Sequence, residues 1–305
     1  MSAFAYRTAI AALSLLAIAA AAIWALRLAV KIQRGDLTAR QRLWEWFYSF
    51  DWGDVTVNNF GFAPAEREGP EKYQHQMYAE LAKPLAARKE RLERPIDLLE
   101  VSCGRGGGLA RLVRDWPGPV RAVGLDLAGN AIAACRRSFG AETGLSFVQG
   151  SALALPFPDE SFDVVLNVEA SNDYGDRARF FREVHRVLRP AGMFLYADTR
   201  PAGQFAATEA LLRDSGFDPE MRDITASVVE ACRADTPRRL DHIRRQLPWP
   251  YRLAFGQTLR CYAAVEGTPT YELFRTRQRL YLMAAASKRA LSTGSFQAAS
   301  GRIPD

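Results

Sequence analysis

A glycine-rich turn between a strand-like and a helix-like segment constrains this chain more than any other feature. Residues 96–101 form a short apolar run, the glycine-rich segment 102–108 follows directly, and a helical pattern occupies 109–116. In such a unit the backbone approaches a ligand closely and helix N–H groups point at it. Gly104 and Gly106 supply the turn, so we expect a ligand to bind there.

An acid at the end of the next predicted strand completes the pattern. Asp126 follows Gly106 by twenty residues, where a carboxylate accepts hydrogen bonds from ribose hydroxyls. Turn and acid together predict a nucleoside-bearing cofactor. A nicotinamide dinucleotide is disfavoured, because Leu109 stands where its G-x-G-x-x-G/A pattern needs glycine or alanine. Glu100 would also sit poorly beside a pyrophosphate, whereas it suits an ammonium group.

Beyond about residue 70 the chain alternates short apolar runs with helical stretches, which predicts a mostly parallel sheet covered by helices. Besides 96–101, strands are expected at 120–126, 145–150, 163–170, 193–198, 221–225 and 279–285, and further helices at 131–139, 178–188 and 204–215. The prediction is an α/β, Rossmann-like fold. It has a seven-stranded, mostly parallel sheet with helices on both faces, plus one N-terminal transmembrane helix.

Residues 9–26 carry the transmembrane prediction, since they are uncharged and almost wholly Ala, Leu and Ile. At about 1.5 Å per residue this run is just long enough to cross a bilayer. Arg7 alone precedes it, whereas five basic residues follow between 27 and 42, which predicts a single-pass membrane protein with a cytoplasmic catalytic domain. A cleavable signal peptide is the alternative. The aromatic segment 43–50 suits either a membrane interface or packing on the domain.

The sequence predicts four regions. They are a transmembrane anchor (1–30), a juxtamembrane segment with the start of a cofactor lid (31–70), the catalytic domain (71–290, with a helical substrate-cap insertion at about 226–267) and a disordered tail (291–305). The net charge of +6 is not gathered into long basic runs, so no nucleic acid partner is predicted. Four widely spaced cysteines and three histidines give no metal-ligand spacing, so no metal is predicted.

Three motifs resemble those of class I methyltransferases that use S-adenosylmethionine (SAM). Residues 100–106 resemble motif I, written D/E-x-G-x-G-x-G; residues 155–165 resemble the loop and fourth strand of the type-11 branch; and 186–192 resemble the segment before its fifth strand. Segments 166–171 and 196–200 are similar to the phthiotriolone and phenolphthiotriolone dimycocerosates methyltransferase family. This resemblance implies SAM as cofactor and O-methylation of a hydroxyl on a hydrophobic lipid or polyketide-type acceptor.

The motifs also assign cofactor residues, which are Glu100, Ser102, Gly104, Gly106, Asp126, Ser151, Ala152 and Asn167. Ser102 replaces the usual first glycine of motif I. Ser151 stands where an acid commonly holds the adenine amino group, so adenine contacts would rely on the Ala152 backbone. Residues 57–62 resemble the start of a lid over the cofactor, and Gln76 and Tyr78 are assigned to the same lid.

O-methylation benefits from a base that removes the hydroxyl proton. The resemblance leads us to expect a histidine after Ser171, but Asn172 and Asp173 follow. Candidate bases are Asp173, Glu169, and His75 if the lid folds over the site. Asp173 is the first choice because ligands sit at the carboxyl ends of strands in open α/β sheets; equally, it suits a helix cap.

Other readings of the sequence remain open. One is C-methylation of a quinone, sterol or polyketide carbon, and another is a non-catalytic SAM-binding membrane protein. In the insertion, Leu247, Trp249, Tyr251 and Phe255 suit either an apolar substrate pocket or packing onto the domain.

Overall fold

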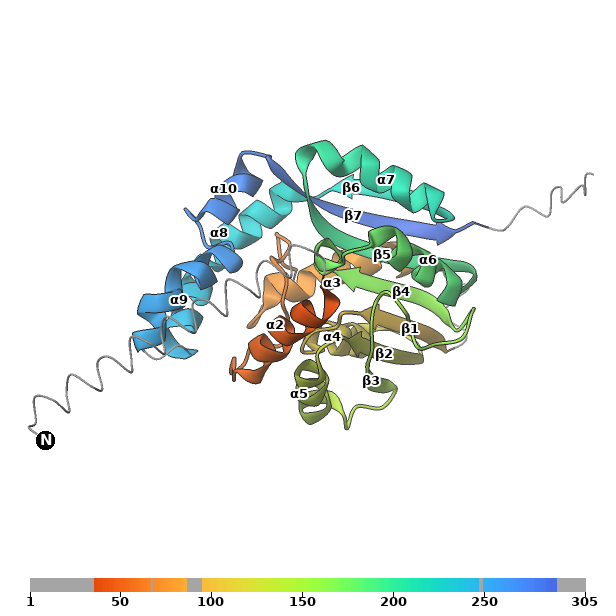
Figure 1. The fold of residues 1–305 in the computed structure, drawn as a ribbon, viewed down its shortest axis with the longest axis horizontal. Helices are drawn as coiled ribbons and strands as arrows, with labels where there is room; N and C mark the ends of the chain where they lie inside the picture. Colours follow the sequence, from red (N-terminus) through yellow and green to blue (C-terminus); the bar gives the residue numbers. More distant parts are fainter. Residues whose placement is uncertain (1–35, 67, 87–94, 247–248, 290–305) are drawn as a thin grey trace, which may run out of the picture.

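The computed structural model describes residues 36–66, 68–86, 95–246 and 249–289 (Figure 1). Within these ranges no helix is both long enough and apolar enough to cross a membrane. The predicted anchor at 1–30 and the predicted tail at 291–305 lie outside the described residues.

One seven-stranded sheet forms the centre of the fold, in the order β3-β2-β1-β4-β5-β7-β6. The strands are β1 (Ile96–Val101), β2 (Val120–Asp126), β3 (Leu145–Gln149), β4 (Phe162–Val168), β5 (Leu188–Pro201), β6 (Phe217–Asp223) and β7 (Arg279–Lys288). β7 is antiparallel to both neighbours, and the remaining pairs are parallel. The predicted Rossmann-like, mostly parallel sheet is confirmed.

Helices cover both faces of this sheet (Figure 1). On one face, α3 (Lys72–Ala86), α4 (Gly107–Asp115), α5 (Gly129–Phe139), α8 (Thr225–Gln246) and α10 (Pro269–Arg275) share a core with the strands. On the other face, α6 (Arg177–Val187) and α7 (Phe205–Asp214) share a second core. α2 (Leu37–Ser49) contacts α5, and α9 (Trp249–Tyr262) contacts α8.

The central strand β4 shows why its sequence is almost continuously apolar. All seven of its residues are buried, as expected of a parallel strand covered on both sides. Val164 and Leu166 point into the core shared with α3 and α4, whereas Val165 points into the core shared with α6. Because β1 pairs in parallel with both β2 and β4, the carboxyl ends of these three strands lie at one edge of the sheet.

Several strand bounds differ from the predicted ranges, and β5 and β6 differ most. β5 extends beyond 193–198 to Pro201, because antiparallel β7 supplies hydrogen-bonding partners from Met193 to Pro201. β6 ends at Asp223 rather than covering 221–225, because the Asp223 carboxylate accepts hydrogen bonds from the Thr225 backbone N–H at 2.9 Å and from its hydroxyl at 2.5 Å. These bonds form the start of α8.

The aromatic segment that follows the predicted anchor is helical. Asp36 caps α2, its carboxylate accepting a hydrogen bond from the Ala39 N–H at 3.0 Å. Glu45 on α2 accepts hydrogen bonds from the Gly129 and Asn130 N–H groups at 2.6 and 2.9 Å. A carboxylate at a helix N-terminus satisfies otherwise unpaired donors, so α2 is fixed against the start of α5.

Candidate active site

The glycine-rich turn joins β1 to α4 with three residues in the left-handed region. They are Ser102, Gly104 and Gly106, with φ of 61°, 56° and 80°. Glycine is required at Gly108 for another reason: a Cβ there would lie 2.0 Å from the ring of Tyr78 on α3. At Gly104 a Cβ would lie 2.9 Å from the Tyr48 hydroxyl oxygen of α2. The turn is therefore covered by α2 and α3.

Asp126 ties this turn to the next one. Its two carboxylate oxygens accept hydrogen bonds from the Gly104 and Ala128 N–H groups, each at 2.9 Å. Burial raises the pKa of Asp126 to about 6, and the two backbone hydrogen bonds oppose that rise. Asp126 is thus mainly ionised at neutral pH, at the position where ribose hydroxyls are expected.

Glu100 is the buried acid at the end of β1. One carboxylate oxygen accepts a hydrogen bond from the Tyr78 hydroxyl at 2.6 Å, while the other is buried without a partner among the described residues. Burial raises the pKa of Glu100 to about 8. A buried carboxylate oxygen without a donor is costly unless a ligand supplies one. The methionine ammonium of SAM is such a donor, so the residues present fit this cofactor.

Ser102 and Asn167 meet at Tyr174, a residue that no sequence motif indicated. The Tyr174 hydroxyl lies 2.5 Å from the Ser102 hydroxyl and accepts a hydrogen bond from the Asn167 amide at 3.0 Å. The same amide donates to the Val101 carbonyl at 2.9 Å. The amide nitrogen of Asn167 therefore braces the turn from β4, whereas Asn167 Oδ1 has no partner among the described residues.

Ser151 and Ala152 form the loop after β3, next to Asp126. The Gly150 N–H donates to the Asp126 carbonyl at 2.9 Å, and the Ser151 hydroxyl accepts a hydrogen bond from the Leu153 N–H at 3.2 Å. The structure thus groups the predicted ribose and adenine residues on the side of the turn away from β4.

Glu169 follows β4 directly and is held by two distant segments. Its Oε2 accepts hydrogen bonds from the Phe60 N–H at 2.8 Å and from the Tyr281 hydroxyl at 3.3 Å. Burial raises the pKa of Glu169 to about 8, with a further rise from the nearby charge of Asp198. A residue that is partly exposed and has a pKa near neutrality suits proton transfer.

Asp173 lies in the short helix η2 (Ser171–Asp173) and is exposed. Desolvation raises its pKa, and the charge of Arg40 lowers it. Its interpretation as a helix cap is wrong, because α6 is capped by Asp176, whose carboxylate accepts a hydrogen bond from the Arg179 N–H at 2.9 Å. Within the described chain, no hydrogen bond fixes the Asp173 carboxylate in position.

His75 on α3 is not grouped with the other candidates. Desolvation is the main cause that lowers the pKa of His75 to about 4, and the charge of Arg111 lowers it further. The charges of Asp115 and Arg114 also act on this pKa, and all three charged residues lie on α4. The carboxylates of Glu100 and Glu169 are not among these main influences. An imidazole with so low a pKa is a weak proton acceptor at neutral pH.

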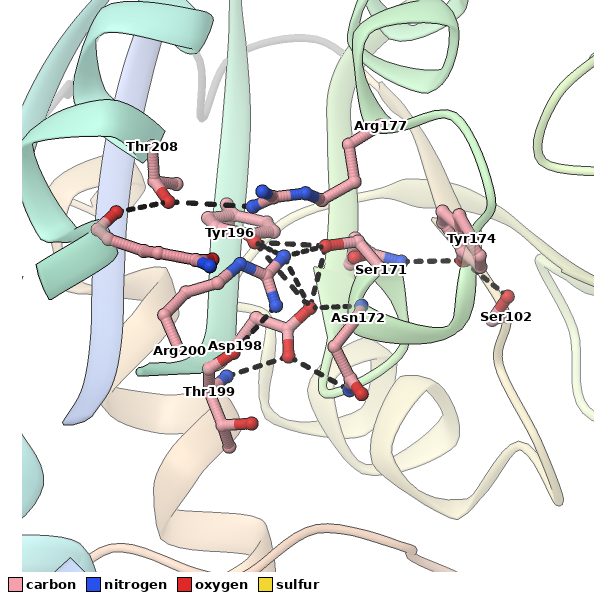
Figure 2. A network of polar contacts seen from close by, with 12 residues as sticks. Ser102, Ser171, Asn172, Tyr174, Arg177, Tyr196, Asp198, Thr199, Arg200 and Thr208 are labelled. Carbon is pink, nitrogen blue, oxygen red and sulfur yellow. Dashed lines mark hydrogen bonds and ion pairs between the residues drawn. The ribbon is translucent and has the colours of Figure 1, made fainter. Parts of the chain in front are cut away.

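A buried polar network, which sequence reasoning missed, fixes the loop that carries Glu169 and Asp173 (Figure 2). Asp198 Oδ2 accepts hydrogen bonds from the Ser171 hydroxyl at 2.6 Å and the Asn172 N–H at 3.0 Å. Arg200 donates to the Ser171 hydroxyl at 2.7 Å and the Tyr196 hydroxyl at 2.6 Å. The sequence signal for this network is the pair of charged residues Asp198 and Arg200 near the end of an otherwise apolar strand. Both are buried, and buried charges require partners.

Two predicted pocket residues of the insertion face solvent instead. The exposed fractions of Trp249 and Phe255 are 67% and 46%, and the side chains of Leu247 and Tyr251 lie outside the described set. Across the described ranges, no group of three or more His, Cys, Asp or Glu side chains could hold a metal ion.

Comparison with known proteins agrees with this geometry. Residues 99–196 match the family described as a methyltransferase domain. The chain is 45% identical over 173 residues to a probable phthiotriol/phenolphthiotriol dimycocerosates methyltransferase 2 of Mycobacterium ulcerans, covering 56% of this chain and 65% of that protein. It is 35% identical over 234 residues to a fatty-acid O-methyltransferase of Mycolicibacterium smegmatis, covering 72% and 82%.

Solved structures support the fold. A putative sarcosine dimethylglycine methyltransferase from Galdieria sulphuraria superimposes with a TM-score of 0.64 at 17% identity, covering 81% of this chain and 98% of that one. The cyclase SpnF gives 0.62 at 18% identity, covering 83% and 96%. At such identities the likeness concerns the fold alone.

Turn, acids and sequence matches together define the class: the chain belongs to the SAM-dependent methyltransferases, which use SAM as their cofactor. It belongs to the family of the phthiotriol/phenolphthiotriol dimycocerosates methyltransferases, of which the Mycobacterium leprae member is 38% identical over 192 residues that cover 69% of that protein. The aligned part spans just under two thirds of the length of the first of these relatives, 65% and 62%.

Proposed function

We propose that this enzyme transfers the SAM methyl group to a hydroxyl oxygen of a hydrophobic lipid or polyketide-type acceptor, with Glu169 as general base. The single observation that carries the assignment of the base is the placement of Glu169. Its carboxylate lies at the carboxyl end of β4, where two hydrogen bonds orient it and its pKa is about 8. Asp173, the first choice from sequence, lacks such orientation within the described residues.

The proton and the methyl group balance in one step. The acceptor oxygen attacks the methyl carbon, the C–S bond breaks, and S-adenosylhomocysteine leaves as a neutral thioether. The hydroxyl proton passes to the Glu169 carboxylate. Because the sulfonium already activates the methyl group, the protein contributes mainly alignment and exclusion of water.

Apolar surroundings support a hydrophobic acceptor. Phe60, whose N–H holds Glu169, packs edge-on against Phe274 with ring centroids 5.2 Å apart and lies 6.5 Å from the Tyr281 ring. The names of two relatives, a dimycocerosates methyltransferase and a fatty-acid O-methyltransferase, point to the same acceptor class. We infer that α8 and α9, in the insertion at about 226–267, cover the acceptor side of the site.

Product analysis tests this function. Purified enzyme is incubated with methyl-labelled SAM and a lipid extract, and labelled products are separated and analysed by mass spectrometry. The proposal requires the label on an ether-linked methyl group, with a mass gain of about 14 units plus the added mass of the isotope. A methyl group bonded to carbon would instead support the C-methyltransferase alternative.

The pH dependence of the reaction follows from the pKa of Glu169. The base must be ionised, and its pKa of about 8 means that the ionised fraction rises about tenfold per pH unit below that value. We expect kcat/KM for the acceptor to rise from pH 6 and level off above about 8. A profile that is already flat from pH 5 upward would contradict Glu169 as base.

We also propose that residues 1–30 anchor the enzyme as a single-pass membrane protein with its catalytic domain in the cytoplasm. Support comes from the uncharged run 9–26 and the basic residues that follow it. Tethering raises the encounter rate with an acceptor in the same bilayer. Deleting residues 1–32 is expected to lower activity on membrane-embedded acceptor by about tenfold or more, while activity on detergent-dispersed acceptor stays unchanged. If the deletion variant were as active as the full chain on the membrane-embedded acceptor, the proposed anchor would be contradicted.

A further inference from the structure

Large apolar side chains that face solvent gather on two helices of the described chain. On α9, Trp249 and Leu253 are 67% and 80% exposed, and Phe255 is also exposed. Trp46 on α2 and Phe50, the residue that follows this helix, are exposed. Clusters of exposed apolar side chains mark contact surfaces, because water solvates them poorly.

The two helices are neighbours at one end of the molecule. The Phe47 ring of α2 and the Tyr262 ring of α9 have centroids 5.6 Å apart. In Figure 1, α9 and the adjoining part of α8 extend away from the sheet, so the exposed side of α9 is not shielded by the central strands.

A basic groove of about 460 Å³ lies between α8 and α9 beside these side chains. Its lining includes three arginines, Arg244, Arg252 and Arg260, and one acid, Asp241. Asp241 is already paired, with Arg244 at 2.7 Å and with Arg245 at 2.8 Å. In the described part of the chain, Arg252 and Arg260 have no carboxylate partner. The groove therefore carries surplus positive charge.

We propose that α9 and the α8/α9 groove dock on an anionic lipid bilayer. Arg252 and Arg260 would bind headgroup phosphates, and Trp249 and Leu253 would enter the interface between headgroups and acyl chains. Indole rings favour that interface, and each arginine close to an anionic surface strengthens binding by about fivefold. A second copy of the chain fits less well, because a symmetric contact through this face would bring the same arginines together.

This surface lies next to the candidate active site. Tyr262, at the end of α9, accepts a hydrogen bond from the Asn58 amide at 2.7 Å, and the charge of Glu169 contributes to raising the pKa of Tyr262. Docking would place the Glu169 end of the sheet close to the bilayer. The proposal concerns residues separate from 1–30 and holds whether or not the methyl acceptor is a lipid.

Local hydrogen exchange on the full-length protein tests the docking. Anionic vesicles of phosphatidylcholine containing phosphatidylglycerol are compared with neutral vesicles of pure phosphatidylcholine. Exchange is followed in residues 249–262, because this segment reports on α9 independently of any anchoring by residues 1–30. We expect exchange in 249–262 to slow by about fivefold or more on the anionic vesicles and to stay unchanged on the neutral ones. Arg252→Gln/Arg260→Gln and Leu253→Ser should each lose most of this slowing.

A matched control uses two exposed arginines on α6, across the sheet from α9. Arg179→Gln/Arg182→Gln changes the net charge equally and should retain the slowing. Unchanged slowing in the Arg252→Gln/Arg260→Gln variant would overturn the proposal. So would equal slowing on neutral vesicles, slowing by inorganic phosphate alone, or lipid-free slowing that grows with protein concentration, which would indicate a second copy. None of these readouts involves methyl transfer, so failure of the proposed reaction would be seen separately.

Discussion

Replacing Glu169 with glutamine is expected to lower kcat by about 10²- to 10⁴-fold, the usual contribution of a general base. Glutamine keeps an oxygen that can accept the hydrogen bonds from the Phe60 N–H and the Tyr281 hydroxyl, so the loop should keep its position. SAM affinity should change by less than about twofold, because Glu169 is assigned to the acceptor rather than the cofactor. Transfer of labelled methyl groups to the lipid acceptor measures the loss.

Asp173→Asn is the matched control for this prediction. It removes the same kind of charge four residues further along the chain, from a carboxylate that no hydrogen bond among the described residues orients. We expect kcat to fall by less than about threefold. The opposite pattern, a large loss at Asp173 and a small one at Glu169, would move the base to Asp173.

Replacing Glu100 with glutamine is expected to change cofactor affinity and stability in opposite directions. The variant loses the ionised partner of the methionine ammonium, so SAM should bind about 10- to 100-fold more weakly, as for other hydrogen bonds to charged groups. Glutamine can still accept the hydrogen bond that Tyr78 donates. The dissociation constant is measured by titration with SAM.

The stability effect of the same change follows from the raised pKa of Glu100. Its pKa is about 8 in the folded chain, against an ordinary value of 4.5 for a glutamic acid side chain, so the folded state resists its ionisation. Folding stability is therefore lost as the pH rises from about 4.5 to about 8. At pH 7 we expect Glu100→Gln without cofactor to be more stable by about 2–3 kcal/mol, seen as a higher Tm. The exposed Glu220→Gln on β6 should change stability by less than about 0.5 kcal/mol.

The strands and the turn of the candidate cofactor site could be predicted from sequence because their signals are local. The strand at Ile96–Val101, the turn glycines and Asp126 all lie within one strand–helix–strand unit, where residue spacing sets position. The apolar pattern of the sequence also predicted the central strands, because a strand such as β4 that is buried on both faces is apolar along its whole length.

The remaining contacts depend on chain segments that only the fold brings together. Glu169 is held by Phe60, 109 residues away, and by Tyr281, 112 residues away. Glu45 caps α5, which begins 84 residues further along the chain. The aromatic-rich segment that contains Glu45 gave no sign of this contact. Short-range spacing carries no information on such pairs, and this is why the order of the candidate bases changes with the structure.

Calorimetric titration of the full chain with SAM tests the site most directly, because it reports binding and proton release together. At pH 7 a Glu100 carboxyl with a pKa of about 8 is about nine-tenths protonated, and it must ionise to pair with the ammonium. Titrations in buffers of different ionisation enthalpy should show the release of nearly one proton, which disappears in Glu100→Gln. Absence of binding heat with SAM and S-adenosylhomocysteine while NAD binds, or equal proton release from the variant, would contradict the account.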